Sequence, residues 1–158
     1  MNVLDLANLT CNFGSAAKPV RALRDVSLSV DAGERLGIVG ESGSGKTTLA
    51  RIALGLTRAS AGTVRILDRD VTSHTRGDRT FIHRNVQMVF QDPMSSLNPR
   101  KRIEDIIALP LRAQGIGNNT SRTQRVRALI DSVGLPQRFL NARPGQLSGG
   151  QRQRVGIA

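Results

Sequence analysis

The stretch of sequence that decides the fold is ERLGIVGESGSGKTTLARIA, residues 34–53. Its residues 36–39 form a short apolar run without a helical period, which predicts a strand buried on both faces. Residues 40–45 predict a glycine-rich loop, and Lys46 opens a predicted helix. The segment from Gly40 to Thr47 fits the pattern G-x-x-x-x-G-K-[ST], which is typical of a loop that binds phosphate groups.

The residue types of this loop match the chemistry of a triphosphate. Glycines let successive backbone N–H groups point at an anion, and a helix start turns its positive dipole end toward the same group. We expect Lys46 to reach the β- and γ-phosphates and the Thr47 hydroxyl to bind Mg²⁺. The predicted binding residues are Gly40, Ser42, Gly43, Ser44, Gly45, Lys46, Thr47 and Thr48. A chance match is the alternative, and the predicted strand before and helix after the loop weigh against it.

Charge and composition exclude other classes of protein. The net charge is +11, but the basic residues are scattered along the sequence. The chain has no Trp, no Tyr and four Phe, so it has few aromatic side chains on which bases could stack. We therefore expect no direct contact with nucleic acid. No apolar run approaches the roughly 18 residues of a membrane-spanning helix, and the first ten residues lack the basic segment of a signal peptide. The sequence predicts a cytoplasmic protein that reaches a membrane only through partners.

Apolar periodicity predicts the remaining elements. Strands are expected at residues 3–10, 26–30, 63–67 and 85–90, irregular structure at 68–80, and helices from residue 102 and over 126–133. Pro110 is expected to end or kink the first of these helices, and Gly134 to end the second. We expect Cys11 to fill a strand position, and His74 and His83 to be ordinary loop or surface residues. The opening third is thus predicted to be an antiparallel β layer against a nucleotide-binding strand, loop and helix.

A second anion signal lies near residue 148. The segment Leu147–Gln151, LSGGQ, precedes a predicted helix in which Ser148 is the N-cap and two glycines expose the amides of the first turn. This cradle has no lysine of its own. A Ser-Gly-Gly helix start is weak evidence by itself, because a plain turn has the same composition.

Taken together, these motifs resemble those of the nucleotide-binding subunits of ABC transporters. A phosphate loop, a glutamine after a predicted strand (Gln91) and the segment Leu147–Gln151 follow in that family's order, and Leu147–Gln151 matches its signature motif letter for letter. The run from Gln91 to Arg100, QDPMSSLNPR, further resembles the dipeptide, oligopeptide and nickel importer branch. The resemblance implies an α/β fold. A P-loop NTPase (ABC ATPase) core with an antiparallel β-subdomain would occupy residues 1–90, and a Q-loop with an α-helical signature subdomain would occupy residues 91–158.

The resemblance also implies roles for individual residues. Phe13 stands where the family has an aromatic side chain that stacks on adenine, although a packed core Phe is the alternative. Gln91 would join Thr47 in binding Mg²⁺ or would place the attacking water, so Lys46 and Gln91 are the implied catalytic residues. The residues implied to contact ATP held by the opposite subunit are Ser148, Gly149, Gly150 and Gln151.

The implied cofactors are ATP and Mg²⁺, and the implied activity is ATP hydrolysis coupled to import of a solute, with a peptide favoured. The implied partners are a second nucleotide-binding subunit in a head-to-tail dimer, transmembrane permease subunits that touch the loop after Gln91, and an extracytoplasmic solute-binding protein. The implied location is the cytoplasmic face of a bacterial-type cell membrane.

One departure from the family pattern affects the expected activity. In this family a strand ending in the Walker B Asp and a catalytic Glu follows the signature helix, and a switch His comes later. Here no Asp or Glu follows Asp131, and both histidines precede the signature. We therefore expect the full-length protein to be an ATPase, and these 158 residues to be truncated before the Walker B strand, inactive in hydrolysis and marginally folded. A soluble ABC ATPase acting on nucleic acid or ribosomes, and an inactive truncation product, are the alternatives.

Overall fold

The computed structural model describes residues 1–15, 18–90 and 97–158. Contacts within the chain divide it into two compact units, Met1–Gln87 and Met88–Ala158. Each unit has its own apolar core. The two units are therefore described separately.

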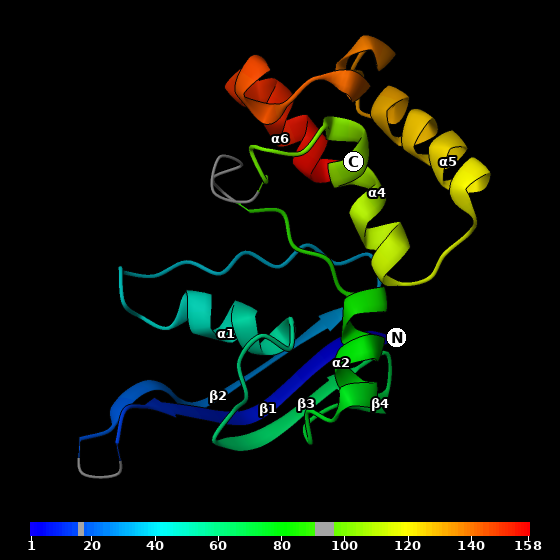
Figure 1. Cartoon of the computed structure of the whole chain (residues 1–158). Coiled ribbons are helices and arrows are strands. Elements are labelled where there is room, and N and C mark those ends of the chain that lie inside the picture. Colours follow the sequence, from blue (N-terminus) through cyan, green and yellow to red (C-terminus); the bar gives the residue numbers. More distant parts are fainter. Residues whose placement is uncertain (16–17, 91–96) are drawn as a thin grey trace. The chain divides into compact units, whose positions relative to one another are not determined.

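The first unit is built on a four-stranded antiparallel sheet (Figure 1). Its strands are β1 (Asn2–Phe13), β2 (Val20–Asp31), β3 (Ala61–Ile66) and β4 (Arg69–Asp70), in the order β2-β1-β3-β4. The register of β1 against β2 shifts between Leu6 and Leu9, where Asn8 adopts a left-handed φ of 53°. This bulge places one extra residue in β1. Both leucines, three positions apart, are consequently buried.

Two helices complete the first unit, α1 (Lys46–Ala53) and α2 (Arg76–Asn85). Leu49 and Ile52 of α1 and Ile82 of α2 are buried in the same core as the sheet. Thr75 caps α2 through a reciprocal pair of hydrogen bonds with Asp78, which explains why the helix begins there. The sheet and its helices thus hold the start of α1, where the phosphate loop ends.

The second unit is helical. Its elements are α4 (Ile103–Ala113), α5 (Asn119–Ser132), the 3₁₀ turns η1 (Gln137–Asn141) and η2 (Pro144–Gln146), and α6 (Gly149–Ile157). The buried core includes Ile103 and Ile107 of α4, Val126 and Ile130 of α5, and Val155 of α6. The two buried residues named in α4 are four positions apart, and so are the two in α5. This helical spacing places each pair on the inward face of its helix.

Several predicted elements are confirmed. The strands expected at residues 3–10, 26–30 and 63–67 correspond to β1, β2 and β3, and the helices expected from Lys46 and over 126–133 correspond to α1 and α5. Gly134 follows α5 with φ 67°, as a left-handed helix terminator does. Cys11 is a buried strand residue, and burial raises the pKa of its thiol.

The two strands predicted on apolar runs were wrong. Residues 36–39 and 86–90 have no regular structure, and Val39 is 96% exposed. A strand buried on both faces needs a hydrogen-bonded neighbour, and no described strand pairs with either run.

Two further expectations need correction. Residues 68–80, expected to be irregular, contain β4 and the start of α2, because the Thr75–Asp78 cap outweighs the polar composition. Pro110 does not end its helix, because α4 continues to Ala113, while a kink at Pro110 stays a prediction.

His74 and His83 are loop and surface residues, as predicted. His74 lies in the loop before α2, where its Nε2 is 2.8 Å from the Gly55 carbonyl oxygen, and His83 is an exposed residue of α2. Among residues 1–15, 18–90 and 97–158, no cluster of three or more His, Cys, Asp or Glu side chains could hold a metal ion. No helix in the same described ranges is long and apolar enough to cross a membrane.

Candidate functional site

The phosphate loop ends at an uncapped helix. Gly45 is the N-cap of α1, and no side chain accepts a hydrogen bond from the first turn, which also lacks an acidic residue. Thr75, Asn118 and Ser148 cap α2, α5 and α6. The start of α4 also lacks a side-chain cap, but its first turn contains Glu104 and Asp105, which α1 has no counterpart for. The first N–H groups of a helix have no intrahelical acceptor. At α1 they are available to an external anion, toward which the helix dipole is positive.

Lys46 lies within the loop that precedes it. Its Nζ donates hydrogen bonds to the carbonyl oxygens of Gly40 at 2.7 Å and Glu41 at 2.6 Å, and lies 3.3 Å from Ser44 Oγ. These three oxygens hold the ammonium group inside the turn of the loop. An incoming phosphate would find a fixed positive charge beside the open amides of α1.

Close approaches affect two glycines of the loop, strictly at Gly45, where the neighbour is backbone, and less strictly at Gly40, where it is a side-chain oxygen. Gly45 has φ 96°, and a methyl group there would lie 2.5 Å from the Ala22 carbonyl oxygen. A methyl group at Gly40 would lie 2.9 Å from Ser44 Oγ. Ala22 of β2 therefore lies against the end of the loop at Gly45, and the Gly40 carbonyl at the start of the loop accepts a hydrogen bond from Lys46.

The remaining predicted residues of this site differ in exposure. Ser42, Gly43 and Thr47 are exposed, whereas Thr48 is half-buried. No side-chain hydrogen bond occupies the Thr47 hydroxyl in the described part of the chain, so this oxygen is available as a ligand. Phe13 ends β1 and is 44% exposed, which argues against a packed core position and leaves its ring accessible.

The second predicted cradle begins α6. Ser148 Oγ accepts from the Gln151 amide at 3.3 Å, and Gln151 Oε1 accepts from the Ser148 amide at 2.8 Å. This capping box engages both end residues of the cradle. Gly149 and Gly150 are exposed, and a methyl group at either would meet nothing within 4 Å. The free amides of this helix start are therefore those of the two glycines.

Sequence reasoning missed how α6 is anchored. Arg154 Nη1 donates to the Gly134 carbonyl oxygen at 3.0 Å, and Arg152 Nη1 donates to the Pro144 carbonyl oxygen at 3.3 Å. The flanking Leu147 and Val155 are buried in the core of the second unit. These contacts fix the exposed glycines between two buried anchors. Arginines two residues apart after a helix start carry no sequence signal that would have revealed these carbonyl partners.

Not all predicted residues can be placed together. Gln91 lies outside the described residues. The phosphate loop belongs to the first unit and the Ser148 cradle to the second. The structure brings together the residues within each cradle.

Comparison with known proteins gives consistent relatives. The profile of a family described as ABC transporter matches residues 23–158. The chain is 45% identical over 139 residues to the oligopeptide transport ATP-binding protein OppD of Mycobacterium tuberculosis, which covers 88% of this chain and 22% of that protein. It is 44% identical over 147 residues to the oligopeptide transport ATP-binding protein OppF of Lactococcus lactis, covering 92% of this chain and 46% of that protein. The chain therefore spans less than half the length of these curated relatives.

Solved structures give the same picture. The dimeric structure of a post-hydrolysis state of the ATP-binding cassette MJ0796, bound to ADP and Pi, matches with a TM-score of 0.84 at 30% identity over 98% of this chain and 67% of that one. CbiO1 of Clostridium perfringens, part of the transporter complex CbiONQ, matches with a TM-score of 0.80 at 22% identity, covering 99% of this chain and 59% of that one. The second likeness concerns the fold alone.

Proposed function

The chain belongs to the ABC transporter family and has the mixed α/β fold of an ATP-binding cassette, and from this premise we propose that it binds ATP and Mg²⁺ as part of a peptide importer. The observation that carries the proposal is the start of α1. Open first-turn amides, a lysine held in the loop before them and an unoccupied threonine hydroxyl meet there. A triphosphate and its metal need these three kinds of group.

The geometry of the loop supports the roles proposed for its residues. The amides from Gly43 to Thr48 would bind phosphate oxygens, together with the hydroxyls of Ser42 and Ser44. Lys46 would exchange the carbonyl oxygens of Gly40 and Glu41 for those of the β- and γ-phosphates. The Thr47 hydroxyl, with Gln91, would hold Mg²⁺, which supplies charge neutralisation of the phosphates when bound.

Three further groups complete the proposed nucleotide site. The accessible ring of Phe13 would stack on adenine. The amides of Gly149 and Gly150, with Ser148 and Gln151 around them, would contact the γ-phosphate of ATP bound to a second subunit. Their exposure supports this role, because a cradle turned into its own core could not reach a neighbour. We propose a head-to-tail pair of subunits on this basis, and the MJ0796 cassette is itself dimeric.

Transport of peptides is proposed from the relatives. OppD and OppF are oligopeptide transport ATP-binding proteins, and the run from Gln91 to Arg100 fits that branch. We propose that the loop after Gln91 contacts permease subunits at the cytoplasmic face of the membrane, with a solute-binding protein outside. A domain division near residue 90 would separate the nucleotide core from this coupling and signature region.

Hydrolysis is assigned to the full-length protein. Phosphoryl transfer needs an acidic metal ligand and a group that positions water, and no Asp or Glu follows Asp131 in these 158 residues. We propose that the 158 residues bind nucleotide without sustained turnover. Steady ATP hydrolysis by them, free of contaminating activity, would contradict this assignment.

The test of the ATP site is Lys46→Ala with Lys101→Ala as the matched control. Lys101 is exposed and lies in the second unit. Loss of a charge-assisted hydrogen bond of about 1.5–3 kcal/mol should weaken binding of ATP–Mg²⁺ by about 10- to 150-fold. Titration calorimetry would measure it, with circular dichroism to verify folding. Equal affinities for the two variants would refute the loop assignment.

A further inference from the structure

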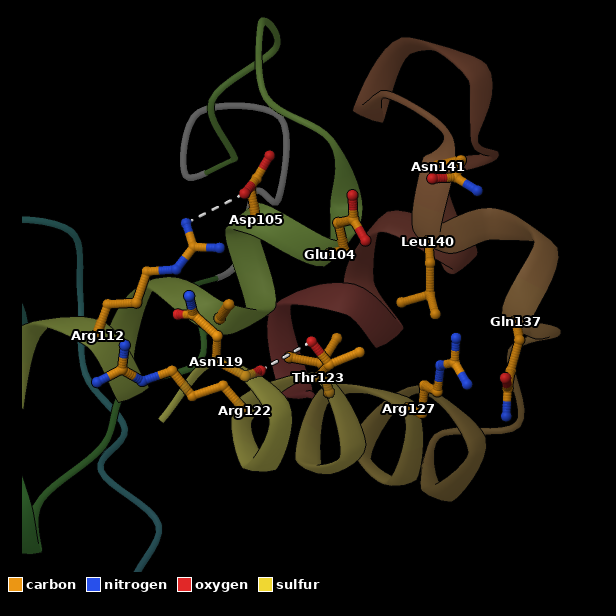
Figure 2. Close-up of a pocket in the computed structure, with 12 residues that line it drawn as sticks. Glu104, Asp105, Arg112, Asn119, Arg122, Thr123, Arg127, Gln137, Leu140 and Asn141 are labelled. Carbon is orange, nitrogen blue, oxygen red and sulfur yellow. Dashed lines mark hydrogen bonds and ion pairs between the residues drawn. The ribbon is translucent and has the colours of Figure 1, made fainter. Parts of the chain in front are cut away.

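A hollow of the second unit lies between α4, α5 and η1 (Figure 2), and no residue of the Ser148 cradle lines it. Its volume is about 420 Å³, within the range of pockets that hold small organic ligands. The apolar part of its lining consists of Ala108, Val126 and Leu140, which are buried residues of the unit's core. The rest of the lining is polar or charged.

Two opposite charges face this hollow without pairing to each other. Figure 2 shows Glu104 on α4 and Arg127 on α5, on different sides of the hollow, with Leu140 beside them. No ion pair joins these two side chains. Within the described residues Arg127 has no hydrogen-bond or ion-pair partner. The only ion pair of Glu104 there is a 3.7 Å contact with Arg102, and both groups are about half exposed.

Two further charges of the lining pair with each other, and Arg122 donates to a backbone carbonyl oxygen. Arg112 Nη1 pairs with Asp105 Oδ1 at 3.1 Å. Arg122 Nε donates to the Ile116 carbonyl oxygen at 2.7 Å. This carbonyl is uncharged, so Arg122 keeps its positive charge. The charges left to a ligand are therefore the carboxylate of Glu104 and the guanidinium groups of Arg122 and Arg127.

We propose that this hollow binds a short peptide. The α-carboxylate would pair with Arg127 and the α-ammonium with Glu104, while the side chains would lie on Val126 and Leu140. Phosphate and simple organic anions carry no cation for Glu104, so they match only half of the charge pattern. Resting on the function proposed above, the site would let the ATP-binding subunit sense peptide that has been imported.

The test uses trialanine and two blocked forms, one N-acetylated and one C-amidated, titrated into the purified chain and followed by NMR. Because both charged groups are partly exposed, loss of either pair should weaken binding by about two- to fivefold. Arg127→Gln should weaken trialanine but not the amidated peptide. Glu104→Gln should weaken trialanine but not the acetylated one. Arg125→Gln, an exposed arginine of the same helix outside the hollow, is the matched control and should leave all affinities unchanged.

Three outcomes would overturn the proposal. They are no shift of α4 and α5 resonances at millimolar trialanine, equal binding of trialanine and both of its blocked forms, and binding of inorganic phosphate as tight as that of trialanine. Peptide binding should also persist in Lys46→Ala, because the hollow contains no residue of the phosphate loop. Loss of ATP binding and loss of peptide binding are therefore separate results.

Discussion

Replacing Gly150 of the Ser148 cradle by alanine should increase the stability of the chain and weaken its proposed function. Gly150 is in the first turn of α6, and a methyl group added there would meet nothing within 4 Å. Its backbone is also outside the left-handed region. Within the part of the chain that the structure describes, nothing therefore requires glycine at this position. Replacement by alanine should raise the free energy of unfolding by about 0.4–1 kcal/mol, because alanine restricts the unfolded chain.

Gly156 provides the matched control in the same helix. A methyl group there also meets nothing within 4 Å, so Gly156→Ala should stabilise the chain by the same amount. Thermal unfolding should show both variants melting roughly 1–4 °C above the parent. A lower melting temperature for Gly150→Ala alone would show that the methyl group does clash.

The two variants should differ in function. If the Gly150 amide meets a phosphate of the opposite subunit, a methyl group beside it blocks that approach. Losing a hydrogen bond to a charged group costs about 1.5–3 kcal/mol, or about 10- to 150-fold in ATP-dependent pairing of complete subunits. Analytical ultracentrifugation with and without ATP would measure the pairing. Equal pairing of Gly150→Ala and Gly156→Ala would refute the close-approach argument.

Three further predictions concern stability. The hydrogen bonds from Thr75, and then Arg69, lower the pKa of Asp78 in the folded chain. The ionised carboxylate therefore stabilises the fold above the unfolded pKa of about 3.9, and this stabilisation is lost as pH falls through the folded pKa. In urea unfolding, Asp78→Asn should be less stable than the parent at pH 6, and the difference should shrink at pH 3. Gly45→Ala should lower the melting temperature, since φ is 96° and the Ala22 oxygen would be 2.5 Å away. On α4, Ile107→Ala should cost about 2–5 kcal/mol in denaturant unfolding, whereas Leu109→Ala, 62% exposed, should change stability by less than about 0.5 kcal/mol.

Elements with local causes were predictable from the sequence. Residues 26–30 alternate because one face of their strand packs on the core of the first unit. Residues 126–133 have helical spacing because one face of their helix packs on the core of the second unit. The Ser148 cap also followed from its neighbours, because a capping box is completed within four residues. The start of α2 carried the same kind of signal at Thr75 and Asp78, and it was overlooked in a polar stretch.

Elements with non-local causes were not predictable. Residues 36–39 have the composition of a central strand, but a strand is made by its neighbours, and no described strand lies beside them. The hollow near Glu104 and Arg127 depends on the spacing of α4, α5 and η1. No motif encodes that spacing, because it results from how core side chains such as Val126 and Leu140 fill the unit.

The starts of α1 and α6 differ in how strongly they can bind an anion. Under the proposed function, this difference decides which of them binds the nucleotide first. At α1 the first-turn amides are open and Lys46 adds a full charge. At α6 the capping box already uses the amides of Ser148 and Gln151, and the cradle has no lysine. A helix dipole contributes about 0.3–1 kcal/mol at an exposed site, and each of the two free glycine amides would add about 1.5–3 kcal/mol. The sum stays below the roughly 8 kcal/mol of micromolar binding. Under the proposed function, the second cradle would therefore add to the affinity for a nucleotide that a phosphate loop already holds, and it would not capture one first.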